Sequence, residues 1–172
     1  MGASTRDFLC KVMDIAERSA AFFADAAKGC GRLGSEMFSE FSSAAKRQAA
    51  RLAKLKAALD AGTPFEAACS LPEEEARDLA ATFRDLAARH TLPKACATEL
   101  GAAAAGLELL RAALRFSEEW AGRAEDQRER GFAAGLVAEQ RGQMLALADL
   151  ERYYEDPEGF ALAKGRGGLD GA

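Results

Sequence analysis

One inward-facing pattern occurs twice in this chain, at a constant offset of 95 residues. It is clearest over residues 135–150, GLVAEQRGQMLALADL, where apolar or amide side chains recur every three or four positions, as on one face of a helix. The two series are Phe41, Ala45, Gln48, Leu52 and Leu55, and then Leu136, Gln140, Gln143, Leu147 and Leu150. A helical pattern that repeats once predicts two similar helical hairpins that bury their faces against each other.

The same spacing predicts four long helices. The first covers residues 4–28 and ends in the glycine-rich KGCGRLG, and the second follows Ser35, its expected N-cap, and ends at DAGTP. The third covers 97–123, EDQRERG forms a turn, and the fourth covers 131–154 and stops at EDPEG. The other residues predicted to face inward are Phe8, Val12, Ile15, Ser19, Phe22, Ala26, Phe38, Leu107, Leu110, Leu114, Ser117 and Ala121.

A long connection separates the second helix from the third. Within it, Leu71 and Pro72 precede three glutamates, which is a typical helix start and predicts a short extra helix. The expected fold is therefore an all-α four-helix bundle, two antiparallel helical hairpins joined by this connection. We expect residues 1–160 to form the bundle and residues 161–172 a flexible tail. An up-down bundle with another connectivity is the alternative.

Composition excludes several classes of protein. The 172 residues suffice for one domain, and the net charge of −4, with basic and acidic residues interleaved, argues against a nucleic-acid partner. No apolar run reaches the length of a membrane span and no signal-peptide core is present, so we expect a cytoplasmic protein without membrane contact. The four widely spaced cysteines are expected to be buried or free thiols rather than metal ligands or disulfides.

Four segments of the predicted helices resemble the rubrerythrin-like branch of the ferritin-like superfamily. They are IAERSAAFFADAA, MFSEFSSAAKRQAARLAKL, AALRFSEEWA and GLVAEQRGQMLALADLERYYEDPEGF, of which the last is the most specific. In that family the first and third helices each carry an inward glutamate, and the second and fourth each carry Glu-x-x-His. The resemblance implies a ferritin-like bundle with a dimetal centre, commonly iron, that reduces peroxide or oxidises iron.

None of the six ligand positions that the resemblance implies holds a carboxylate or an imidazole. They fall on Ala16 in the first helix, Ala45 and Gln48 in the second, Ser117 in the third, and Gln140 and Gln143 in the fourth. The only histidine, His90, belongs to the connection and matches no ligand position. Four buried carboxylates without metal would be severely destabilising, so a chain that abandons the metal must remove them together. We interpret the six positions as a vestigial metal site. Its amides and hydroxyl are expected to form a polar plug, hydrogen-bonded to one another or to a trapped water molecule.

Displaced acids are the alternative source of a metal site. Glu17, Glu118, Glu119 and Glu139 each adjoin a vestigial position, but one residue turns a side chain by roughly 100° around a helix, so these acids should face outward or sideways. A shifted iron site would make the chain a peroxidase or oxidase, and an emptied bundle centre could instead carry a small molecule.

We therefore expect a metal-free and non-catalytic protein, with no catalytic residues and no cofactor unless a shifted site holds iron. It would act by self-association, as a dimer, or by binding a protein partner. Phe22 and Phe23 are adjacent, so one of them must turn away from the helix seam, where it could meet a second subunit.

Overall fold

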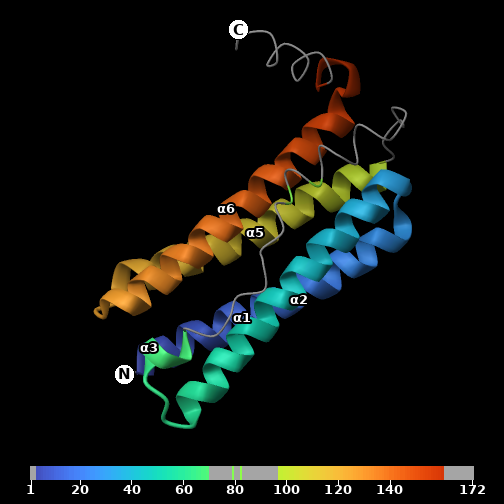
Figure 1. Cartoon of the computed structure of the whole chain (residues 1–172). Coiled ribbons are helices and arrows are strands. Elements are labelled where there is room, and N and C mark those ends of the chain that lie inside the picture. Colours follow the sequence, from blue (N-terminus) through green and yellow to red (C-terminus); the bar gives the residue numbers. More distant parts are fainter. Residues whose placement is uncertain (1–2, 70–78, 80–81, 83–96, 161–172) are drawn as a thin grey trace, which may run out of the picture.

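The computed structural model of this chain describes residues 3–69, 79, 82 and 97–160, and every regular element among them is a helix. The elements are α1 (Ala3–Ala26), η1 (Ala27–Gly29), α2 (Arg32–Asp60), α3 (Phe65–Ala68), α5 (Ala97–Arg123) and α6 (Gln127–Glu155). Figure 1 shows the four long helices lying side by side along most of their length. The expected all-α class and its four long helices are confirmed.

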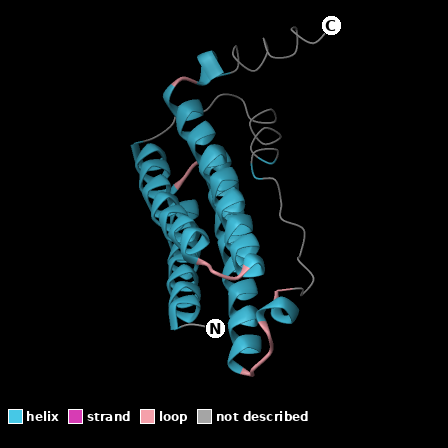
Figure 2. Cartoon of the chain, turned by 90° about the vertical axis from the view of Figure 1, so that its left-hand side faces the viewer, coloured by secondary structure: helices cyan, strands magenta, loops and turns pink. Residues whose placement is uncertain are grey.

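Hydrogen bonds fix the directions of the helices. α1 and α2 form an antiparallel hairpin, in which the Ser42 hydroxyl donates to the carbonyl of Ala20 at 2.8 Å. At one end of the molecule the backbone N–H of Gly31 donates to the Glu99 carboxylate at 2.7 Å. This contact joins the start of α2 to the start of α5, so these two helices run in the same direction (Figure 1). Figure 2 shows the helices from the side.

Contacts across the two hairpins set which helices are neighbours. α1 lies against α5, because the Phe8 ring stacks on Trp120 with ring centroids 6.2 Å apart. α2 lies against α6, because Arg51 pairs with Glu139 at 2.5 Å. Going round the molecule, the order of the helices is therefore α1, α2, α6, α5.

The buried apolar side chains form two separate clusters, one toward each end of the helices. The first cluster, at the end where α2 begins, includes Phe23, Leu33, Met37, Phe38, Phe41, Leu107, Leu110, Leu147, Leu150, Tyr153 and Tyr154. The second cluster, at the end where α1 begins, includes Phe8, Leu9, Val12, Leu52, Leu55, Leu59, Trp120, Ala133 and Leu136. The apolar core is thus interrupted midway along the bundle.

Both series of the repeated pattern face inward as predicted. All ten of their side chains are buried, including the glutamines. The seam predicted for α1 was wrong in part: Phe23 and Ala27 are buried, whereas Ile15, Phe22 and Ala26 are only partly buried. Alanine carries no strong pattern signal, so the buried Ala16 and Ala20 could not correct the phase from sequence. In α5, Leu114 and Ala121 were likewise predicted to face inward but are only partly buried.

Two predicted helix starts were also wrong. Ser35 does not cap α2, which begins three residues earlier at Arg32 with Gly31 in the N-cap position. The fourth helix begins at Gln127 rather than Gly131, because Asp126 caps it and the helix absorbs most of the expected turn. In contrast, the bounds of α5 match the prediction of 97–123.

Asp126 provides a pH-dependent cap for α6. Its carboxylate accepts the backbone N–H groups of Glu129 and Arg128, and these hydrogen bonds hold the pKa of the Asp126 carboxyl below its ordinary value of 3.8. A carboxyl with a lowered folded-state pKa stabilises the protein above its unfolded-state pKa and loses that effect as the pH falls through the folded-state value.

We expect Asp126→Ala to lower the melting temperature by roughly 2–4 °C at pH 7, with the deficit shrinking below about pH 4. Thermal unfolding followed by circular dichroism between pH 2.5 and 7 measures this. Asp126→Asn keeps a capping oxygen and is the control, with a smaller deficit at pH 7. A deficit for Asp126→Ala that stays constant over the whole pH range would contradict the assignment.

Several predictions lie outside the described residues. They are the helix start at Leu71 and Pro72, the placement of His90 and Cys96, and the tail 161–172. Within the described ranges, no helix has both the length and the hydropathy to cross a bilayer.

Candidate functional site

The six positions at which the resemblance implies metal ligands all lie in the interior, where the two apolar clusters are interrupted. We call these six residues the central layer: Ala16, Ala45, Gln48, Ser117, Gln140 and Gln143. Ser117 and Gln140 are 0% exposed, and the other four are no more than 8% exposed. None of the six belongs to either apolar cluster. The structure therefore brings together, in the core, the residues that the sequence singled out.

Contacts of neighbouring residues place the members of the central layer at nearly the same height in the bundle. Arg51, one turn after Gln48, pairs with Glu139, which directly precedes Gln140. The Arg141 side chain, directly after Gln140, donates to Glu118 at 2.7 Å, and Glu118 directly follows Ser117.

The hydrogen bond from Ser42 to Ala20 likewise places these parts of α1 and α2 at the same height in the bundle. Ala16 lies one turn before Ala20, and Ala45 lies about one turn after Ser42 on the antiparallel helix. All four long helices therefore contribute to this level of the bundle.

Four polar groups of the central layer are sealed from solvent and lack hydrogen-bond partners among the described residues. These groups are the Nε2 of Gln48, the Oγ of Ser117, and both the Oε1 and the Nε2 of Gln140. A buried polar group without a partner costs about 1–3 kcal/mol, so three such side chains at one level are an unusual feature of a helical core. The expected mutual hydrogen bonding of a polar plug is not observed between these atoms.

Sequence analysis missed one inward residue of α5 at this level. Ala113 is 5% exposed and lies one turn before Ser117, outside both apolar clusters. Ala113 lies between Ala112 and Leu114, and the predicted seam placed Leu114 inward instead, because a leucine gives a stronger pattern signal than an alanine.

The four acids next to the vestigial positions lie away from the centre. Glu139 pairs with Arg51, Glu118 pairs with Arg141, and Glu119 pairs with Arg123 at 2.8 Å. Glu17 is exposed and lines a surface groove. Their predicted outward or sideways direction is confirmed, and three of the four are neutralised by arginine.

The residues present do not fit the dimetal centre that the family resemblance implies. Iron and related metals are held by carboxylate, imidazole or thiolate groups, whereas the central layer offers only amides, a hydroxyl and methyl groups. Within residues 3–69, 79, 82 and 97–160, no three His, Cys, Asp or Glu side chains gather in an arrangement that could hold a metal ion.

No family model, curated protein or solved structure matches this chain. The rubrerythrin-like resemblance therefore stays a prediction that rests on the four helical segments and their inward positions.

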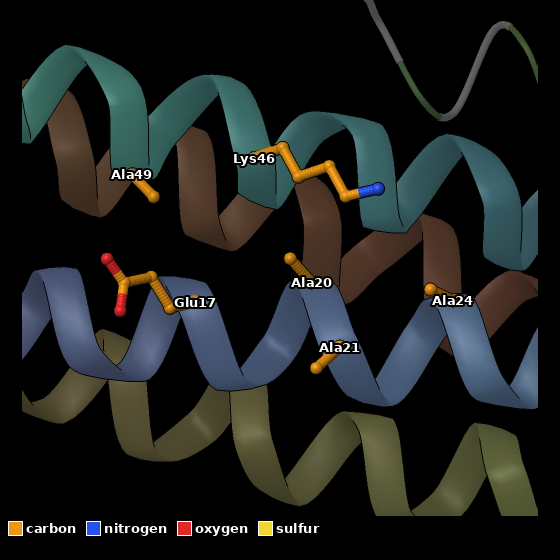
Figure 3. A pocket seen from close by; sticks show the side chains of 6 residues that line it. All are labelled: Glu17, Ala20, Ala21, Ala24, Lys46 and Ala49. Atoms are coloured by element: carbon orange, nitrogen blue, oxygen red, sulfur yellow. The ribbon is translucent and has the colours of Figure 1, made fainter.

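A second feature lies on the outer surface between α1 and α2. It is a groove of about 440 Å³ with an almost entirely apolar lining. Figure 3 shows its floor of small side chains, with Glu17 on α1 and Lys46 on α2 on opposite sides. Its other lining residues are Ala20, Ala21, Ala24 and Ala49.

The cysteines and aromatic residues in the described part of the chain form no further site. Cys10 is an exposed thiol, and Cys30 and Cys69 are half-buried. Phe8, Phe23 and Trp120 are core residues, and of these three only Phe8 was predicted to face inward.

Proposed function

We propose that this chain is a rubrerythrin-related, ferritin-like bundle that has lost its dimetal centre and acts without catalysis, by self-association or partner binding. The observation that carries the proposal is the central layer: six buried positions from four helices, at one level, without a carboxylate or an imidazole. The direction of the helices also supports the proposal. α2 and α5 run in the same direction and are joined by a long connection, as in ferritin-like folds.

The pairing of the neighbouring acids supports the loss of the metal. A shifted dinuclear site would need Glu118 and Glu139 to turn inward, which would leave Arg141 and Arg51 without their partners. It would also bury carboxylates beside unpartnered amides.

Elemental analysis of the purified full chain tests this proposal. Protein produced in medium supplemented with iron and manganese should carry well below one metal ion per chain and should show no peroxide turnover. About two ions per chain, or peroxide turnover that disappears in Glu139→Ala or Glu17→Ala, would overturn it.

The α1–α2 groove is the surface that we propose for self-association, with a second copy of the chain as its partner. Glu17 and Lys46 lie on opposite sides of an apolar floor, and neither forms an ion pair with any residue in the described part of the chain. A two-fold axis parallel to α1 and α2 would place α1 of one copy opposite α2 of the other. Glu17 would then approach Lys46 of the second copy, twice in each dimer.

Charge reversal tests this interface. Glu17→Lys and Lys46→Glu are each expected to raise the dimer dissociation constant by about tenfold or more, because each replaces two attractions by two repulsions. The double variant Glu17→Lys/Lys46→Glu should restore dimerisation. Sedimentation velocity at several protein concentrations measures the dimer dissociation constant of each variant.

Lys54→Glu is the matched control, since Lys54 is an exposed lysine of α2 that does not line the groove. A monomeric native chain, or a double variant no better than the single ones, would rule out this interface.

A further inference from the structure

The geometry points to a buried water site in the central layer, where ordered water molecules bridge Gln48, Ser117 and Gln140. This inference rests on the proposed loss of the metal centre and names what occupies the same level of the bundle instead.

The evidence is the number and placement of unpartnered polar atoms. Gln140 is 0% exposed and has neither its amide nitrogen nor its carbonyl oxygen in a hydrogen bond with the described residues. The Nε2 of Gln48 and the Oγ of Ser117 are also buried without a hydrogen bond to the described residues. Since nearly all buried polar groups in folded proteins have a partner, these atoms require one.

The three side chains come from three helices and lie at one height. The Arg51–Glu139 pair aligns Gln48 with Gln140, and the Arg141–Glu118 pair aligns Gln140 with Ser117. The Nε of Arg51 is a further buried donor, at the edge of the same level, that has no hydrogen bond with any described residue. Several donors and one amide acceptor therefore lie at about the same height in the bundle.

The chemistry of these groups indicates which molecule can occupy the site. The amides and the hydroxyl are neutral, so they would not balance a metal cation or an inorganic anion, and Arg51 is already neutralised by Glu139. The apolar clusters above and below exclude a long polar molecule. Water both donates and accepts, and it typically makes about three hydrogen bonds to buried groups of this kind.

The residues around these groups are small enough to leave room for water. Ala16, Ala45 and Ala113 are buried at this level, whereas the levels above and below are filled by leucine and aromatic side chains. Side chains that end at Cβ leave more room beside the amides than leucines would. A polar site lined by small residues is where buried water is retained.

Magnetic relaxation dispersion of water oxygen-17 tests the inference, because its amplitude reports water molecules held inside a protein. The native full chain should show a dispersion, and Gln140→Leu/Ser117→Ala should lose amplitude equivalent to at least one water molecule. Ser42→Ala is the matched control: its buried hydroxyl already donates to Ala20, so the amplitude should equal that of the native chain.

An unchanged amplitude in Gln140→Leu/Ser117→Ala, or no dispersion in the native chain, would overturn the water site. Should the double variant fail to fold, Ser117→Ala and Gln48→Met are measured singly against the same two outcomes. Elemental analysis of the same samples separates the two proposals. Metal in the sample counts against the proposed function, whereas metal-free protein without the predicted loss of amplitude counts against the water site alone.

Discussion

Gly106→Leu is expected to lower the free energy of unfolding by more than about 3 kcal/mol, a large part of the 5–15 kcal/mol typical of a folded domain. A Cβ at Gly106 would lie 2.7 Å from Cε1 of Phe23 and 2.9 Å from Cδ2 of Leu147, well inside normal contact. The Phe23 ring cannot yield easily, because it is 1% exposed and stacks on Phe38 and Phe41. Gly106→Ala should produce a smaller loss of about 1–2 kcal/mol, since the helix propensity of alanine offsets part of the clash.

Gly142→Ala is the matched control for this experiment. Gly142 is exposed on α6, and a Cβ there would meet nothing within 4 Å. The substitution should therefore raise the free energy of unfolding by about 0.5–1 kcal/mol. Urea denaturation of the three variants measures the differences. If Gly106→Ala stabilises the chain as much as Gly142→Ala does, the close approach of α1 and α6 to α5 is wrong.

Placing metal ligands at all six positions of the central layer is expected to convert the chain into a metal-dependent protein. The variant carries Ala16→Glu, Ala45→Glu, Gln48→His, Ser117→Glu, Gln140→Glu and Gln143→His. Without metal, its four buried carboxylates should lower the melting temperature by well over 10 °C or prevent folding at neutral pH. Adding Mn²⁺ or Fe²⁺ should restore folding with about two ions bound per chain, because two divalent ions balance four carboxylates.

A variant with the four glutamates but with Gln48 and Gln143 retained is the control, and it should recover less stability on adding metal. Thermal unfolding with and without metal, together with elemental analysis, measures both variants. Failure of the sixfold variant to bind metal in any folded state would count against the proposed rubrerythrin-like ancestry, whatever the native chain binds.

The long helices could be predicted because each buries a strongly patterned face. The bounds of α5 and the inward positions of α2 and α6 follow from apolar residues at helical spacing. The start of α2 could not be predicted, because the contact that replaces a capping side chain comes from Glu99, on another helix. The phase of α1 was obscured by its many alanines, which fit a buried or an exposed face equally well.

The candidate site was predictable as a set of positions but not as a set of contacts. Spacing alone placed Gln140 and Gln143 inward, and both are buried. Sequence could not show that Gln140 has no hydrogen-bond partner among the described residues, because hydrogen bonding between helices depends on their relative heights. Nor could it show that Arg51 and Arg141 hold the neighbouring acids, since both pairs join different helices.

The division of the apolar core has a consequence for how the bundle opens. Each long helix passes through two separately packed ends and a polar middle, and the middle adds little apolar burial to hold those ends together. Cooperative unfolding depends on continuous packing, so the two ends are expected to behave as distinct units of local opening in hydrogen exchange. Such a bundle can unfold locally at one end while the other end stays packed, and the central layer is the boundary between the two ends.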